Sequence, residues 1–197
     1  MVRALIASGV VCGLVWAGHV SAEDRIEPLV NEDGMYSQTW FLDSFLEMQP
    51  DLEDSAAEGK RFAIIFEQKG CIYCKKIHEE VLSDPKINAY IRENYNIVQL
   101  NLWGDRAVVD FDGEELPEKD MARKWGVAFT PTILFFPDDP SVTEGKAANE
   151  IEVARMPGAF GKITFLGMFE WVAEKGYEGD EHFQRYIIRK AEEAQAG

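Results

Sequence analysis

Two cysteines separated by two residues constrain this chain more than any other feature of its sequence. Cys71 and Cys74 follow a continuous apolar run, residues 62–66 (FAIIF), which is typical of a strand covered on both faces. After the cysteines, apolar residues recur at spacings of three and four as far as Val81, which indicates a helix. The unpaired N–H groups and partial positive charge of a helix N-terminus favour a thiolate, the reactive form of cysteine, at Cys71. We therefore predict dithiol chemistry in which Cys71 is the nucleophile and Cys74 resolves the mixed disulfide.

Two other uses of this pair stay open from the residues alone. With His78, four residues beyond Cys74, it would bind copper or zinc, which would make the chain a metal-binding or metallochaperone module. A purely structural disulfide is the other alternative, although so short a loop removes little chain entropy. Because structural zinc normally takes four ligands and the sequence has no second C-x-x-C pair, redox chemistry is favoured.

Residues 1–22 have the pattern of a secretory signal peptide. Arg3 precedes an apolar run at residues 4–18, and the small residues at 20–22 fit a cleavage site. The segment is too short and wrongly flanked for a membrane span. Its removal also removes Cys12, so the exported protein keeps only the cysteines of the motif. A single, closely spaced cysteine pair in an exported protein favours redox chemistry over a purely structural disulfide.

Length and charge narrow the class of protein further. The 197 residues allow one domain with an ordinary core. The formal net charge of −15 argues against nucleic acid as a partner. Residues 23–60 are expected to be an N-terminal extension that contains a helix, and residues 61–197 the main domain.

The expected elements alternate between strands and helices. We expect a mobile lead-in at residues 23–34. We expect a helix at 37–48, because Trp40, Phe41, Phe45 and Met48 recur at helical spacing. Further elements, in chain order, are a helical piece at 51–59, a strand at 62–66, helices ending near 83 and 94, a strand at 97–102, a hairpin within 103–115, a helix at 117–126, a strand at 133–136, a polar loop at 138–149, a strand at 151–155, and helices at 165–176 and from 180 onward. This order predicts an α/β fold with a central mixed β-sheet flanked by helices.

Three features together resemble the thioredoxin superfamily. The first is the unit of strand, C-x-x-C and helix. The second is residues 122–132 (ARKWGVAFTPT), which match the family's segment leading to its cis-proline, with Trp125 where tyrosine or phenylalanine is usual. The third is Gly158, where the family keeps a glycine facing the substrate groove. The resemblance implies a thioredoxin-like fold over residues 61–197, with the N-terminal extension at 23–60 and the hairpin as an insertion.

Longer stretches are similar to SoxW-type periplasmic thioredoxins, which occur with bacterial sulfur-oxidation systems. These stretches are WFL at 40–42, FEQKGCIYCKKIHEE at 66–80, LNLWGD at 100–105, DFDG at 110–113 and FTPTILFF at 129–136. The resemblance implies a periplasmic thiol–disulfide oxidoreductase that is held reduced by a membrane electron carrier of the DsbD or CcdA kind. It implies clients with disulfides, such as sulfur-oxidation proteins or cytochrome-maturation components. It implies a monomer, with no cofactor besides a redox-active Cys71–Cys74 disulfide.

The resemblance also assigns roles to residues away from the cysteines. Pro131 is expected to be a cis-proline that leaves the carbonyl and N–H of Thr130 available to an extended client chain. Gly158 and Tyr73 are expected to contact the client as well. Independently of the resemblance, the position of Lys75 next to the motif makes it either a modulator that adds positive charge near Cys71 or a solvated surface residue, and the same holds for Lys69.

The chain departs from cytosolic thioredoxins around the cysteines. Those proteins place a buried aspartate six residues before the first cysteine, where this chain has Ile65. The nearest acid is Glu67, which we expect at the surface, or else as the group that takes the proton of Cys74. The residues between the cysteines are Ile72 and Tyr73, without the histidine of strong periplasmic oxidants. We therefore expect a reductant, although tyrosine there resembles DsbC and DsbG, so an isomerase or oxidase stays open.

Three further side chains near the motif invite a functional interpretation. We expect His78 to be a partly buried helix residue rather than a base or a ligand. Trp103 and Phe111 are expected to pack the hairpin rather than to form a rim that contacts clients.

Overall fold

The computed structural model describes residues 25–196, so the predicted signal peptide lies outside the described residues. Within residues 25–196, no helix is both long enough and apolar enough to cross a bilayer. In chain order the elements are β1 (Leu29–Val30), β2 (Tyr36–Ser37), α1 (Met48–Ala57), β3 (Arg61–Glu67), α2 (Ile72–Lys76), the π-helical turn η1 (Ile77–Val81), α3 (Pro85–Asn94), β4 (Tyr95–Asn101), β5 (Ala107–Val109), β6 (Glu115–Pro117), α4 (Glu118–Lys124), β7 (Thr132–Phe135), η2 (Pro140–Val142), α5 (Ala148–Ile151), β8 (Ala154–Pro157), α6 (Lys162–Ala173), η3 (Gly176–Glu178) and α7 (Phe183–Ala196).

The central sheet has four strands in the order β4–β3–β7–β8. Strand β3 pairs in parallel with β4 and antiparallel with β7, and β7 pairs antiparallel with β8. The predicted mixed sheet is therefore confirmed. Strand β3 is the apolar run of the sequence and is buried along its whole length, because strands lie on both sides of it and helices cover both faces. Its C-terminal end delivers the chain to the cysteine pair.

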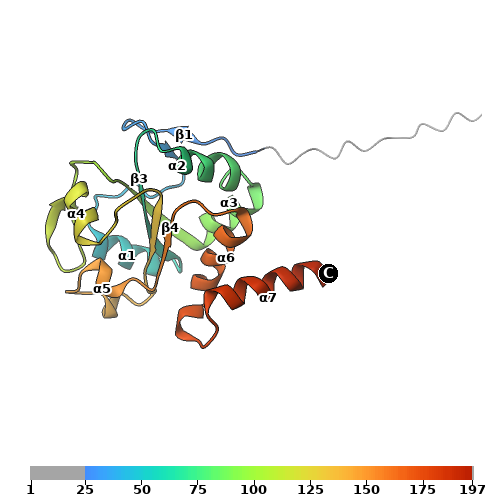
Figure 1. Ribbon diagram of the computed structural model, residues 1–197. Helices are drawn as coiled ribbons and strands as arrows, with labels where there is room; N and C mark the ends of the chain where they lie inside the picture. The colour runs from blue at the N-terminus through green and yellow to red at the C-terminus, as the bar shows by residue number, and fades with distance from the viewer. Residues whose placement is uncertain (1–24, 197) are drawn as a thin grey trace, which may run out of the picture.

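Alternation along β3 divides the core into two layers. Phe62, Ile64 and Phe66 point into one core, which α1, α4 and α5 close. Ala63 and Ile65 point into the other, which η1, α3 and α6 close. Figure 1 shows α1, α4 and α5 on one side of the sheet and α2, α3 and α6 on the other. The same alternation places the last residue of β3, Glu67, on the face that carries the cysteine helix.

The segment before α1 differs from both of its predictions. From Leu29 onward the chain is an antiparallel hairpin of β1 and β2 rather than a lead-in. The helix predicted at 37–48 does not form: a turn at residues 39–40 is followed by irregular chain, in which the Leu42 N–H donates to the carbonyl of Ile97 on β4. The helical spacing gave a wrong prediction because these apolar residues do not share one buried face. Phe45 is 96% exposed, whereas Phe41 packs on the second core. Helix α1 begins only at Met48 and includes most of the second predicted piece.

Three predictions further along the chain have different outcomes. The predicted hairpin forms, since β5 and β6 pair antiparallel, but its second strand extends to Pro117, where the helix was expected to begin. The strand predicted at 151–155 is shifted: Ile151 ends α5 and packs into the first core, and β8 starts at Ala154. The polar loop predicted at 138–149 likewise contains η2 and the first residues of α5.

Asp51 on α1 makes the fold sensitive to pH. Burial raises the pKa of this carboxyl from 3.8 to about 6, assisted by repulsion from Asp54 and Glu47 and opposed by the hydrogen bond from Ser44. The folded state therefore binds this proton more tightly than the unfolded chain. The resulting stabilisation is complete below about pH 4 and is lost as the pH rises through about 6.

We expect Asp51→Asn to raise the free energy of unfolding at pH 7.5 by about 1–2 kcal/mol, allowing for solvent screening at a partly exposed group. The gain over wild type should shrink towards zero near pH 4, which urea denaturation at several pH values measures. The exposed Glu53→Gln is the matched control and should show no such pH-dependent gain. A gain that is the same at every pH would contradict the assignment to Asp51.

Candidate active site

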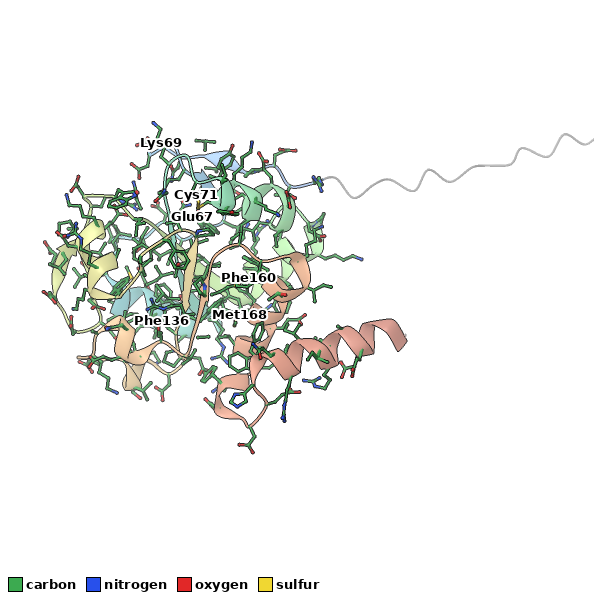
Figure 2. All side chains as sticks on the ribbon, viewed as in Figure 1. Glu67, Lys69, Cys71, Phe136, Phe160 and Met168 are labelled. Atoms are coloured by element: carbon green, nitrogen blue, oxygen red, sulfur yellow. A yellow bond between two sulfur atoms is a disulfide. The ribbon has the colours of Figure 1, made fainter. Side chains whose placement is uncertain are left out.

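Cys71 and Cys74 form a disulfide at the start of α2. Cys71 is the N-cap residue, and its Sγ accepts a hydrogen bond from the Cys74 N–H at 3.0 Å. Cys74 is buried, at 2% exposure, whereas Cys71 is partly exposed. Figure 2 shows Cys71 in the upper part of the domain, below Lys69 and just above Glu67 in this view. Cys71 is therefore the sulfur that another protein can reach.

The Thr130–Pro131 peptide bond is cis, as the sequence predicts. This loop faces the cysteines, because the Thr130 hydroxyl lies 3.4 Å from Cys71 Sγ. Gly158 adjoins the same loop and donates its N–H to the Pro131 carbonyl at 2.8 Å. In the described part of the chain, no backbone–backbone hydrogen bond uses the N–H or the carbonyl of Thr130. Both groups are thus available to an extended chain laid beside Cys71.

A groove of about 360 Å³ lies beside Cys71, with Tyr73, Trp103, Phe129 and Thr130 among its lining residues. Trp103 is 65% exposed and its Nε1–H donates to Gln68 Oε1 at 2.9 Å. The expectation that Trp103 only packs the hairpin is therefore wrong, because its ring lines this groove. Phe111 does fill the first core, as expected.

Sequence reasoning missed two other apolar side chains around the disulfide. Ile72 is 72% exposed and Phe129 is 53% exposed, and both line the groove. The available signal was their position: Ile72 lies within the motif, and Phe129 directly precedes Thr130. Together with Tyr73 and Trp103 they surround Cys71 with apolar surface.

The loop that carries Trp103 is held by a buried carboxylate. Glu118 is 1% exposed, accepts the Asn101 N–H at 2.8 Å and pairs with Arg106. Residue 104 is glycine because an added Cβ would lie 1.9 Å from a Glu118 oxygen. These contacts fix the backbone on both sides of Trp103.

The two lysines near the motif have partners of their own. Lys75 pairs with Glu79 at 3.5 Å and lies over the Tyr36 ring, and the Glu79 carboxylate raises the pKa of this lysine. The Lys69 side chain packs against Gly34 in the β1–β2 turn. Within residues 25–196, neither lysine forms an ion pair or hydrogen bond with Cys71.

Glu67, at the end of β3, and His78, on the helical turn that continues α2, are both more deeply buried than predicted. Each is 0% exposed, and His78 Nε2 lies 3.0 Å from a Glu67 carboxylate oxygen. The prediction of a surface glutamate is wrong because Glu67 shares the inward face of β3 with Ile65. His78 is fully rather than partly buried because Tyr36 and Phe41 of the N-terminal segment pack on its ring.

The metal-binding alternative meets an obstacle in these contacts. His78 Nδ1 lies 3.1 Å from Gln38 Nε2, so both ring nitrogens already have hydrogen-bond partners. Among residues 25–196, no group of three or more His, Cys, Asp or Glu side chains is placed to hold a metal ion. His78 would have to break both contacts to join the two sulfurs.

Comparisons with known proteins agree with this geometry. The model of the thioredoxin-like domain family matches residues 48–170, more than half of the chain, which include the disulfide, the groove and the cis-proline. Comparison with curated proteins gives no match.

Two solved structures are similar to this chain. A thioredoxin-fold protein from Helicobacter pylori is 19% identical, with a TM-score of 0.51 over 68% of this chain and 86% of that one. A thioredoxin from Thermus thermophilus is 23% identical, with a TM-score of 0.49 over 64% of this chain and 84% of that one. The likeness to the Helicobacter pylori protein concerns the fold alone. With a mixed sheet, a C-x-x-C disulfide at a helix start and a facing cis-proline, the chain belongs to the family of thioredoxin-like domains.

Proposed function

We propose that this protein is a periplasmic thiol–disulfide oxidoreductase that reduces disulfides of exported proteins. The observation that carries the proposal is the Cys71–Cys74 disulfide, with its exposed sulfur beside Thr130 and its buried sulfur one turn into α2. A buried structural disulfide would not need an apolar groove beside one of its sulfurs.

The reaction divides into two exchanges between sulfur atoms. The Cys71 thiolate attacks one sulfur of the client disulfide, which forms a mixed disulfide and releases the other client sulfur as a thiolate. Cys74 then gives up its proton and attacks Cys71 Sγ, which forms the Cys71–Cys74 disulfide and releases the second client thiolate. Two electrons pass from the cysteine pair to the client, and no other cofactor takes part.

The surroundings of Cys71 support binding of an extended client segment. The N–H and carbonyl of Thr130 are available for main-chain hydrogen bonds, as in the pairing of a peptide with a sheet edge. The exposed rings of Tyr73, Trp103 and Phe129 offer contact area for apolar side chains next to the client cysteine.

The wider setting of the reaction rests on the sequence resemblance. Residues 1–22 support export to the periplasm, and the similarity to SoxW-type thioredoxins supports clients in sulfur oxidation and re-reduction by a membrane carrier of the DsbD or CcdA kind. The protein would act as a monomer, and its acidity disfavours nucleic acid.

The reduction potential tests the proposed direction of electron flow. Because no histidine stands between the cysteines, we expect a potential closer to about −270 mV, as in thioredoxin, than to about −120 mV, as in DsbA. Equilibration of the mature protein with glutathione buffers, followed by thiol labelling, measures it. A potential above about −150 mV would identify an oxidase and overturn the reducing assignment. Failure to reduce a model disulfide such as insulin would overturn the oxidoreductase assignment altogether.

A further inference from the structure

A chain of buried amides runs from the N-terminal hairpin to the carboxylate under the cysteine helix. Asn88 Nδ2 donates to the Leu82 carbonyl at 2.8 Å and to Gln38 Oε1 at 3.2 Å. Gln38 Nε2 then faces His78 Nδ1. Gln38, Asn88 and His78 are all buried, at 4%, 3% and 0% exposure. The sequence gives no local signal for this chain, because its members come from three separate segments.

Hydrogen-bond polarity along this chain sets the protonation of His78. A carbonyl can only accept a hydrogen bond, so the Asn88 atom that faces the Leu82 carbonyl must be the NH₂ nitrogen. The same NH₂ group also donates to Gln38, so the Gln38 atom that faces it must be the amide oxygen. Gln38 therefore presents its NH₂ group to His78 Nδ1, which must accept and cannot carry a proton. The single ring proton lies on Nε2, and His78 donates it to Glu67 as a neutral imidazole.

The side-chain amide of Gln99 fixes the protonation state of Glu67 by the same hydrogen-bond argument. Gln99 Nε2 donates to the Tyr36 carbonyl at 2.6 Å and also to Glu67 Oε2. Glu67 thus receives hydrogen bonds from His78 and Gln99, and in the described residues no acceptor faces it that would bind a carboxyl proton. No lysine or arginine between residues 25 and 196 forms an ion pair with it. Glu67 is therefore a buried carboxylate without a compensating positive charge.

The Glu67 carboxylate is connected to the cysteine helix through His78. His78 follows Cys74 by four residues on one helical run, so the two buried side chains are neighbours on the same face. Three other ionisable side chains around the site make contacts of their own. The Tyr36 ring stacks on His78, Lys75 pairs with Glu79, and Arg106 donates to the Gln99 carbonyl while it pairs with Glu118.

We infer that Gln38 and Asn88 are positioning residues that hold His78 as the neutral Nε2–H tautomer, so that Glu67 stays an uncompensated anion which keeps Cys74 protonated. Like charges in a poorly solvated interior repel, so a thiolate at Cys74 is disfavoured over one at Cys71. The inference rests on the proposed thiol–disulfide function and adds the residues that decide which sulfur is the nucleophile. Gln38 precedes the region that the family model matches, so the N-terminal hairpin becomes part of the redox site.

The tautomer is tested first, by long-range ¹H–¹⁵N NMR of the native mature protein at about pH 5.5. The expected spectrum shows His78 protonated at Nε2 only. In Gln38→Glu a carboxylate replaces the donor that faces Nδ1, and His78 should then carry protons on both nitrogens. An imidazolium at His78 in the native protein overturns the inference, and needs no variant to fold.

The effect on Cys74 is tested by thiolate absorbance against pH in a Cys71→Ala background. Adding Glu67→Gln should lower the midpoint of the Cys74 transition by at least one pH unit, a tenfold change in its acid dissociation constant. Glu79→Gln removes one negative charge from the surface of the same helical run and should leave the midpoint in place. Equal midpoints for the two variants overturn the inference. This titration uses no client, so that result leaves the reductase activity, measured separately with insulin, unaffected.

Discussion

Cys71→Ala is expected to reduce insulin turnover to the background rate of the assay, whereas Cys74→Ala should accumulate covalent client complexes. The reason is the division of roles between an exposed sulfur at the helix start and a buried one. Without Cys74, the mixed disulfide on Cys71 has no neighbouring thiol to resolve it. Non-reducing gels of a periplasmic extract treated with the reduced Cys74→Ala protein measure the complexes, and mass spectrometry identifies the clients.

The double variant Cys71→Ala/Cys74→Ala is the control for this experiment and should capture nothing. Complexes that form on Cys71→Ala instead would reverse the assignment of the nucleophile. Clients drawn from a sulfur-oxidation system would support the finer proposal, and clients from other exported proteins would replace it. Either set of clients would leave the two-step exchange intact.

Trp125→Ala should lower the free energy of unfolding by about 3–5 kcal/mol, the largest stability effect we expect from one substitution. The ring is 1% exposed and packs edge-to-face on Phe66 of β3. Its Nε1–H also donates to the buried carboxylate of Asp110 at 2.8 Å. Truncation therefore opens a cavity in the first core and removes a hydrogen bond at once. Chemical denaturation monitored by far-ultraviolet circular dichroism measures the loss.

Trp125→Phe separates the two contributions. This variant keeps an aromatic ring, so it loses only part of the side-chain volume, but it loses the N–H donor to Asp110 entirely. Asp110 still accepts hydrogen bonds from Lys124 and the Ala148 N–H. We expect a loss of about 1–2 kcal/mol. Trp103→Ala, at an exposed tryptophan, should change stability by less than about 0.5 kcal/mol. Equal losses for the alanine and phenylalanine variants at position 125 would show that the hydrogen bond dominates over packing.

Local patterns in the sequence were enough to predict the central fold. The run at 62–66 reads as a buried strand because both of its faces are apolar, and it is β3. The cysteines and Pro131 were found because each belongs to a short segment whose chemistry depends on near neighbours in the chain. The disulfide and the cis peptide bond both appear where the sequence placed them.

The errors concern residues whose environment comes from distant parts of the chain. Residues 37–48 have helical spacing, but the Leu42 N–H bonds to β4, and Trp40 and Phe41 pack on the second core. That core is built from distant parts of the chain, so the segment's own sequence does not reveal it. Glu67 looked like a surface residue because a lone glutamate after an apolar strand usually is one. Its alternation with Ile65 was a readable signal for the inward face, whereas its partners Gln99 and His78 were visible only in three dimensions.

The amide chain under the cysteine helix also bears on how the protein folds. Gln38 reaches His78 and Asn88, 40 and 50 residues away, and Asn31 reaches Gln99 across 68 residues. Contacts across such separations form after local helices, because each requires closure of a long loop. Gln99 can meet Glu67 only once β3 and β4 are paired. An emerging chain therefore presents its cysteines on a nascent helix before the buried carboxylate is in place, and the redox properties of the mature protein arise only when the N-terminal hairpin docks.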